Sequence, residues 1–171
     1  GGFSRERRLE IMRDSRVGAF GIAGAGGLLL LKYGALVSLL TLPEPGRQVS
    51  LLLFPMLSRW SMVLALGAFP YVRSEGLGSP FHQGGARGAA VVAAATAVGS
   101  AIILGAFGGA GMLVAVSALA WLTGRYMAGM LGGLTGDTYG AINELAEAVA
   151  LIAAVALVPH GWIEPLPDLL R

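Results

Sequence analysis

The residues of this sequence best suited to chemistry are a group of polar side chains at the entry to a long apolar run. Asp137, Asn143, Glu144 and Glu147 all lie in this segment. An acid inside a membrane span is costly, so such residues usually face a cavity or a partner. On a helix, Asp137 and Glu144 share one face but lie about 10 Å apart along the axis. A metal ion held by Asp137 therefore needs ligands from another segment.

Simpler explanations exist for some of these side chains. An acid at a helix amino terminus complements the helix dipole, which would explain Asp137 but not Glu144 and Glu147 deeper in the run. Arg59 lies within another apolar run, where snorkelling to an interface is awkward. We expect it to pair with an intramembrane acid or to bind phosphate. Lys32 is explained by snorkelling or a polar helix contact, and we assign it no role.

The composition requires an apolar solvent for most of the chain. Charged residues make up 13% of the 171 residues and apolar ones 55%, with 27 glycines besides and a mean hydropathy of +0.71. Soluble domains average about 25% charged residues, and a small globule is mostly surface. We therefore expect an integral membrane protein. The net charge of +2 argues against a nucleic-acid binder, and the lack of cysteine excludes thiolate chemistry.

Five apolar runs predict an all-α, polytopic transmembrane helix bundle with about five spans. About 20 apolar residues cross a bilayer as a helix, and these runs are continuous rather than alternating with period two. Residues 18–158 form the predicted transmembrane domain, after a polar cytoplasmic segment (1–17) and before a short non-cytoplasmic tail (159–171). Gly108–Gly111 is the favoured turn between the third and fourth runs. The predicted spans are 18–42, 49–71, 89–110, 111–131 and 139–158.

The distribution of arginines orients this bundle, because short cytoplasmic loops carry an excess of Lys and Arg. With five spans, the side opposite the amino terminus holds only Arg47 and Arg171. The amino-terminal side is therefore predicted to be cytoplasmic, and it also gathers the polar segments 13–16, 73–75 and 136–144, which indicates a site there. The arginines on this side are Arg5, Arg7, Arg8, Arg13, Arg16, Arg73, Arg87 and Arg125.

Several of these segments resemble those of a known family. Arg7–Gly18 and Leu134–Glu144 closely resemble segments of the cobalamin synthases, also called adenosylcobinamide-GDP ribazoletransferases. Pro55–Trp60 and Tyr71–Gly78 are similar to the middle region of that family. The resemblance covers essentially the whole chain in the expected order. Its most specific part is Gly-Asp-Thr-x-Gly-Ala-x-Asn-Glu, which begins at Gly136.

The resemblance implies a magnesium-dependent, multi-pass transferase of the cell inner membrane that acts late in cobalamin biosynthesis. Such an enzyme joins α-ribazole, or its 5′-phosphate, to adenosylcobinamide-GDP and releases GMP. A ribose hydroxyl attacks phosphorus, and this chemistry needs alignment and cations more than covalent help from the protein. The implied partners are these two substrates and the lipid bilayer, whereas the oligomeric state stays open.

The same resemblance implies roles for individual residues. Asp137 would hold magnesium, while Asn143 and Glu144 would orient that ligand or the incoming hydroxyl. Asp14 would be a second metal ligand or a partner of Arg16. Guanidinium groups pair well with phosphate. The candidates for contact with the diphosphate are Arg16, Arg59 and Arg73.

One departure from the family concerns the start of the chain. The family has an aspartate-rich segment, Asp-Gly-x-x-Asp-x-x-Asp-Gly, just upstream of the residues that Gly1-Gly2-Phe3 resembles. This sequence lacks those aspartates. The resemblance therefore implies an N-terminally truncated chain, whose activity on its own is in question.

Other classes of function stay open from the residues alone. A small transporter or channel subunit would use Arg59 and Lys32 to line a pathway. A purely structural membrane subunit would leave Asp137 and Glu144 unexplained. Another phosphotransferase acting on a nucleotide-activated alcohol would also carry its aspartate motif upstream.

Overall fold

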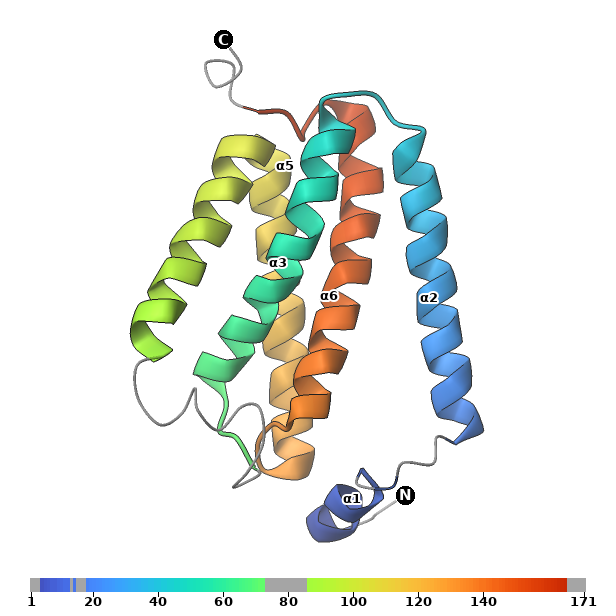
Figure 1. The fold of residues 1–171 in the computed structure, drawn as a ribbon, viewed down its shortest axis with the longest axis vertical. Helices are drawn as coiled ribbons and strands as arrows, with labels where there is room; N and C mark the ends of the chain where they lie inside the picture. The colour runs from blue at the N-terminus through green and yellow to red at the C-terminus, as the bar shows by residue number, and fades with distance from the viewer. Residues whose placement is uncertain (1–3, 13, 15–17, 73–85, 166–171) are drawn as a thin grey trace.

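The computed structural model describes residues 4–12, 14, 18–72 and 86–165 of this chain. These residues form a helical bundle, which confirms the predicted all-α class (Figure 1). Within the described part, one short polar helix precedes four long helices, and a turn of 3-10 helix follows them. The elements are α1 (Arg5–Ile11), α2 (Ala19–Leu40), α3 (Gly46–Ala68), α5 (Ala86–Leu131), α6 (Gly136–Leu157) and η1 (Val158–His160).

The longest helix, α5, is a hairpin of two helical arms. Its helical path breaks at Ala106, where φ is 45° and ψ is −132°, and the chain reverses direction (Figure 1). The two arms meet closely, because a Cβ on Gly109 would overlap the carbonyl oxygen of Ala101. The predicted turn at Gly108–Gly111 was therefore wrong by a few residues. These glycines stay helical, and Gly109 permits the arms to approach each other.

The described helices fit a multi-pass membrane protein. Four of them are long and apolar enough to cross a membrane, and α5 consists of two helical arms, which is compatible with the predicted five spans. Helices α3, α5 and α6 begin three residues before their predicted spans, at Gly46, Ala86 and Gly136. The first turn of each of these helices carries polar residues, which a search for apolar runs leaves out.

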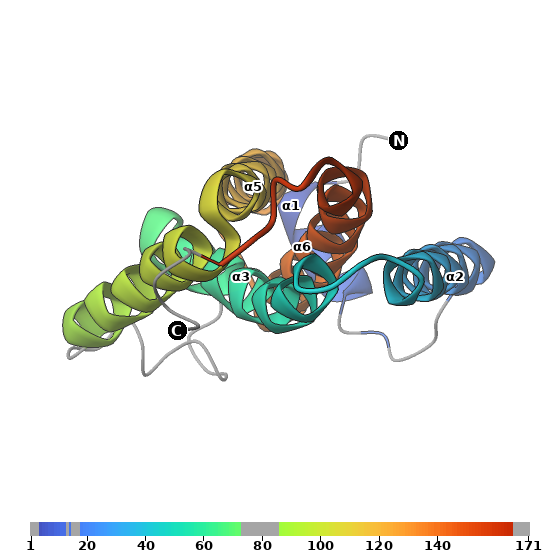
Figure 2. The same cartoon turned by 90° about the horizontal axis from the view of Figure 1, so that it is seen from above.

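Helix α6 lies between its neighbours in the bundle. Seen from above, α2 lies at one edge and the first arm of α5 at the other (Figure 2). Helix α3 packs on both α5 and α6, whereas α2 packs mainly against α6. Ala146, Ala150 and Ala154 recur every four residues along α6 and are fully buried in the core. Small side chains at this spacing let membrane helices approach closely.

The end of the bundle away from α1 is closed by the segment that follows η1. Ile163 is completely buried, and the Gly108 amide donates a 2.7 Å hydrogen bond to the Trp162 carbonyl. A Cβ on Gly108 would lie 2.5 Å from that carbonyl oxygen, and one on Gly46 would lie 2.9 Å from the carbonyl oxygen of Ile163. Two glycines therefore admit this segment between the helix ends.

Candidate functional site

The polar end of the bundle is organised by the turn that joins α5 to α6. Gly132 and Gly133 have φ angles of 78° and 154°, which favour glycine. The Leu134 amide donates to the Pro70 carbonyl (2.7 Å), and the Leu134 carbonyl accepts from the Val72 amide (2.9 Å). A Cβ on Gly133 would lie 2.5 Å from the Pro70 carbonyl oxygen. The two glycines thus allow the end of α3 to be tied to the start of α6.

Two threonines fix the first turn of α6. The Thr135 hydroxyl accepts from the Thr138 amide (3.3 Å), and the Thr138 hydroxyl accepts from the Thr135 amide (2.8 Å). Both residues are buried, and this reciprocal capping box satisfies amides that would otherwise lack partners. Asp137 lies between them and is exposed, at the positive end of the helix dipole. The cap therefore holds the carboxylate at the surface of this end.

Two aromatic rings stack beside the same turn. The centroids of Tyr71 and Tyr139 are 6.2 Å apart, and the ring planes differ by 10°. The Tyr139 hydroxyl is buried and has no hydrogen-bond partner among the described residues. A buried hydroxyl left without a partner costs about 1–3 kcal/mol. This atom therefore marks a place that a further polar group would stabilise.

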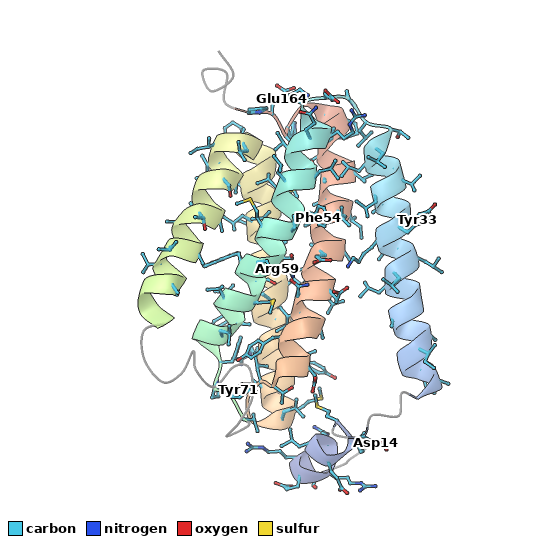
Figure 3. All side chains as sticks on the ribbon, viewed as in Figure 1. Asp14, Tyr33, Phe54, Arg59, Tyr71 and Glu164 are labelled. Carbon is cyan, nitrogen blue, oxygen red and sulfur yellow. The ribbon has the colours of Figure 1, made fainter. Side chains whose placement is uncertain are left out.

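Helix α1 covers this end of the bundle. Arg8 donates from Nη1 to the carbonyl of Met130 (3.2 Å) in the last turn of α5, where the helix dipole favours a cation. The guanidinium of Arg5 lies against Gly132. Asp14 follows α1 and is exposed at the same end, as Figure 3 shows. Of the three polar segments predicted to gather at one end, Asp14 and the start of α6 lie here. Residues 73–75 and the rest of 13–16 lie outside the described residues.

A second polar group lies near the middle of the bundle and joins α3 to α6. Arg59 donates from Nη1 to Oδ1 of Asn143, and the same nitrogen lies 3.6 Å from Oε1 of Glu147. Asn143 donates from Nδ2 to that Glu147 oxygen (3.1 Å). Figure 3 shows Arg59 well away from both ends of α3. The expected pairing of Arg59 with an acid inside the bundle is therefore present.

Lys32 joins this group from α2. Its Nζ lies 2.8 Å from Oε2 of Glu144 and 2.5 Å from Oε2 of Glu147. The side chains of Lys32 and Glu147 are only 14% and 13% exposed. Two cations and two carboxylates leave the group formally neutral, which limits the cost of placing charge in an apolar bundle. We call Lys32, Arg59, Asn143, Glu144 and Glu147 the charged cluster.

The structure separates the predicted site residues into two groups. Asp137 and Asp14 lie at the end of the bundle that α1 covers, which we call the α1 end. Arg59, Asn143 and Glu144 lie in the charged cluster. Asn143 is six residues beyond Asp137, or about 9 Å along the helix axis. Asn143 and Glu144, which we expected to orient the metal ligand Asp137 or the incoming hydroxyl, are bonded within the cluster. Two further candidates, Arg16 and Arg73, lie outside the described residues.

The described residues supply only some of the ligands that a magnesium ion would need. Within them, no three His, Cys, Asp or Glu side chains gather where they could hold a metal ion. Mg²⁺ is commonly bound by one or two carboxylates, with water and substrate phosphates as the other ligands. An exposed carboxylate such as Asp137 suits that donor set as one ligand, and the remaining ligands would have to come from elsewhere.

A groove of about 370 Å³ opens beside the charged cluster, between α3 and the first arm of α5. Arg59 lines it, and 64% of this side chain is exposed. A single cation in an apolar groove suits a ligand with both an anionic and an apolar part. The other lining residues are Pro55, Met56, Trp60, Val63, Ala93, Thr96 and Ala97.

Three important side chains were missed or given no role by the sequence reasoning. Lys32 received no role, although an ionisable residue inside a span signals a partner by default. Glu147 was singled out but placed in no site. Thr135 was overlooked, although a Thr-x-x-Thr pattern directly before an apolar helix is close to a capping-box signature.

Comparisons with known proteins identify relatives of this chain. A model of the family described as cobalamin-5-phosphate synthase matches residues 1–155. The adenosylcobinamide-GDP ribazoletransferase of Roseiflexus sp. (strain RS-1) is 39% identical over 156 residues, which cover 91% of this chain and 57% of the relative. The protein of the same name from Syntrophobacter fumaroxidans is 41% identical over 162 residues, covering 92% and 62%.

This similarity has a definite extent. The chain spans about three fifths of the length of these curated relatives, since 57 to 62% of each is covered. No solved structure matches the chain. The family match over residues 1–155 exceeds half of the chain. This chain therefore belongs to the cobalamin-5-phosphate synthase family.

Proposed function

We propose that this chain is part of a membrane-bound transferase that joins α-ribazole, or its 5′-phosphate, to adenosylcobinamide-GDP. The product would be adenosylcobalamin or its 5′-phosphate, and GMP would be released. The observation that carries the proposal is the family match over residues 1–155, together with relatives named adenosylcobinamide-GDP ribazoletransferase at about 40% identity. The arrangement of polar residues at the α1 end supports it.

In this reaction a ribose hydroxyl oxygen forms a bond to phosphorus, and the bond from that phosphorus to GMP breaks. The protein must align the two reactants and neutralise charge on the phosphoryl oxygens. The capped first turn of α6 and its tie to residues 70–72 give the α1 end a fixed geometry. Arg59, which is exposed beside an apolar groove, is our candidate for contact with the diphosphate, and Arg16 and Arg73 keep the same assignment from the sequence.

Magnesium dependence belongs to the same proposal. Asp137 is the residue of this chain that we assign to the ion, with Asp14 as a second candidate at the same end. When bound, such an ion would neutralise charge on the phosphoryl oxygens. Asn143 and Glu144 would act through the charged cluster, because their described bonds are to Arg59, Glu147 and Lys32.

The location of the protein is also proposed. The arginine-rich α1 end would face the cytoplasm, and the bundle would lie in the cell inner membrane. Phosphorylated, nucleotide-activated substrates are polar, so a site that opens at the cytoplasmic end would receive them from water.

Complementation tests the proposal in cells. A strain that lacks its cobalamin synthase would be transformed with the complete gene that encodes this sequence. The cells would grow with cobinamide and the lower-ligand base in the medium. We expect mass spectrometry to detect cobalamin with the unaltered protein and with the control Glu164→Ala, which changes an acid at the opposite end of the bundle (Figure 3). Asp137→Ala should give none, although it should accumulate equally in membranes.

Two results would contradict this account. If the unaltered protein accumulates in membranes and the cells contain only adenosylcobinamide-GDP, the proposed reaction is wrong. If Asp137→Ala supports as much cobalamin as Glu164→Ala, the reaction stands but the assignment of Asp137 fails.

A further inference from the structure

The charged cluster contains a cation, Lys32, that the proposed function does not use. This residue lies near the middle of α2, and both of its described partners, Glu144 and Glu147, lie on α6. Helix α2 has little other anchorage, because Leu39 is its one buried residue and α6 is its main neighbour. The two ion pairs therefore connect a peripheral helix to the centre of the bundle.

Glu147 is shared between two cations. Its Oε2 lies 2.5 Å from the Lys32 nitrogen, while its Oε1 lies 3.6 Å from Nη1 of Arg59 and accepts a hydrogen bond from Asn143. The carboxylate is only 13% exposed, so it needs a close counter-charge. Lys32 supplies that charge directly, and the separation of 3.6 Å shows that Arg59 is not drawn into full contact with Glu147.

Arg59 is thereby kept at the edge of the bundle. Its Nη1 is bonded to Asn143, while 64% of the side chain is exposed and lines the groove between α3 and α5. A guanidinium has five N–H donors, so a bond through one nitrogen leaves others for an anion. If Lys32 lost its charge, the buried Glu147 carboxylate would draw Arg59 inward, because an uncompensated charge in an apolar bundle is costly.

We propose that Lys32 is a positioning residue that neutralises Glu147 and so keeps the Arg59 guanidinium available to an anionic ligand in the groove. The proposal deepens the proposed function, and it rests on that function only where the anion is identified as the diphosphate of the substrate. In this proposal Lys32 is assigned no contact with the substrate. It acts through Glu147, and Asn143 holds the other side of the guanidinium.

The proposal is tested by the chemical reactivity of Arg59 in the complete gene product, reconstituted in lipid. Phenylglyoxal modifies exposed arginines, and peptide mass spectrometry would measure the modification rate at Arg59 with the Arg47 peptide as an internal reference. We expect Lys32→Met to lower the Arg59 rate about tenfold, because the guanidinium turns toward Glu147. Lys32→Arg should stay within about threefold of the unaltered protein, because it restores the charge.

A second substitution separates positioning from simple docking of α2. In the double variant Lys32→Met/Glu147→Gln, no carboxylate at position 147 remains to capture Arg59, so the rate should recover to within about threefold of the unaltered protein. A role limited to holding α2 in place predicts no recovery, because both partners of that ion pair are gone. Unchanged Arg59 reactivity in Lys32→Met, or no recovery in the double variant, would overturn the proposal.

Enzyme kinetics provide a second measurement, and its interpretation depends on the proposed function. We expect Lys32→Met to raise KM for adenosylcobinamide-GDP about tenfold and to change kcat less than threefold, with recovery in the double variant. Arg47→Met, which removes a partly exposed cation from the far end of α3, should change neither. If the unaltered protein releases no GMP but the reactivity pattern holds, the proposed function fails while Lys32 keeps its positioning role.

Discussion

The two ends of this bundle are built in different ways. At the far end, the segment after η1 inserts Ile163 among the helices, and Gly46 and Gly108 let its backbone pass at close range. At the α1 end, the turn at Gly132 and Gly133 is held by backbone hydrogen bonds and the capping box, while Asp137 stays exposed. One end is closed by apolar packing, whereas the other presents polar groups on a fixed frame.

This difference indicates a division between stability and chemistry. Tight apolar contacts tolerate little change in volume, so substitutions at the far end should affect folding. Exposed polar groups contribute little to packing, so substitutions at the α1 end should affect function while the fold persists. The charged cluster lies between the two ends and connects α2 and α3 to α6.

The largest effect is expected where the two arms of α5 meet. Gly109→Val would place side-chain atoms against the Ala101 backbone, which cannot move without opening the hairpin. We expect the variant not to accumulate as folded protein, as judged by membrane fractionation and size-exclusion chromatography. Gly111→Ala is the matched control, because nothing lies within 4 Å of a Cβ there. Normal accumulation of Gly109→Val would remove the proposed link between close packing and stability.

The next effect concerns activity without loss of fold. Asp137→Asn keeps the size of the side chain but removes its charge, so we expect GMP release to fall about a hundredfold or more. The melting temperature of the purified protein should change by less than about 2 °C, because the side chain is exposed. A large fall in melting temperature would instead show that Asp137 also contributes to the stability of the fold. The proposed division between a stabilising end and a functional end would then be wrong.

A smaller effect is expected from the cap that supports this end. Thr135→Val retains the shape of the side chain but removes the hydroxyl that accepts from the Thr138 amide. We expect a loss of about 1 kcal/mol in the free energy of unfolding, measured by denaturant titration in detergent. Thr135→Ser should retain most of that stability. If Thr135→Val and Thr135→Ser behave alike, the capping box does not hold α6.

The smallest effect is expected at an exposed ion pair of the far end. Arg47 pairs with Glu44 three residues away, and both side chains are partly exposed to solvent. Since such pairs contribute little, Arg47→Met should change the free energy of unfolding by less than about 0.5 kcal/mol. Lys32→Met should be clearly more destabilising in the same titration, because Lys32 is nearly buried. Equal effects would show that burial does not distinguish the two ion pairs.

Much of the fold could be predicted from the sequence, because apolar runs of about 20 residues leave few alternatives to helices across a bilayer. The long helices and their order along the chain follow from those runs. The position of the α5 reversal did not follow, because a glycine-rich stretch such as Gly105–Gly111 suits both a turn and close helix packing. The structure uses most of these glycines for packing.

The candidate site was harder to predict. Asp137 could be placed near a helix start because it directly precedes an apolar run, although the capping role of Thr135 was overlooked. The partners of Asn143 and Glu144 could not, because Lys32 and Arg59 lie about 80 to 110 residues away along the chain. Only the packing of α2 and α3 on α6 brings these charges together, and helix packing partners do not follow from periodicity.

The most direct test of the central claim is the measurement of GMP release by the purified complete gene product in lipid. Adenosylcobinamide-GDP and α-ribazole would be supplied, with magnesium added or chelated. We predict one GMP for each corrinoid product formed, loss of both on chelation, and recovery when magnesium is restored. A folded protein that forms neither product with magnesium present would contradict the account.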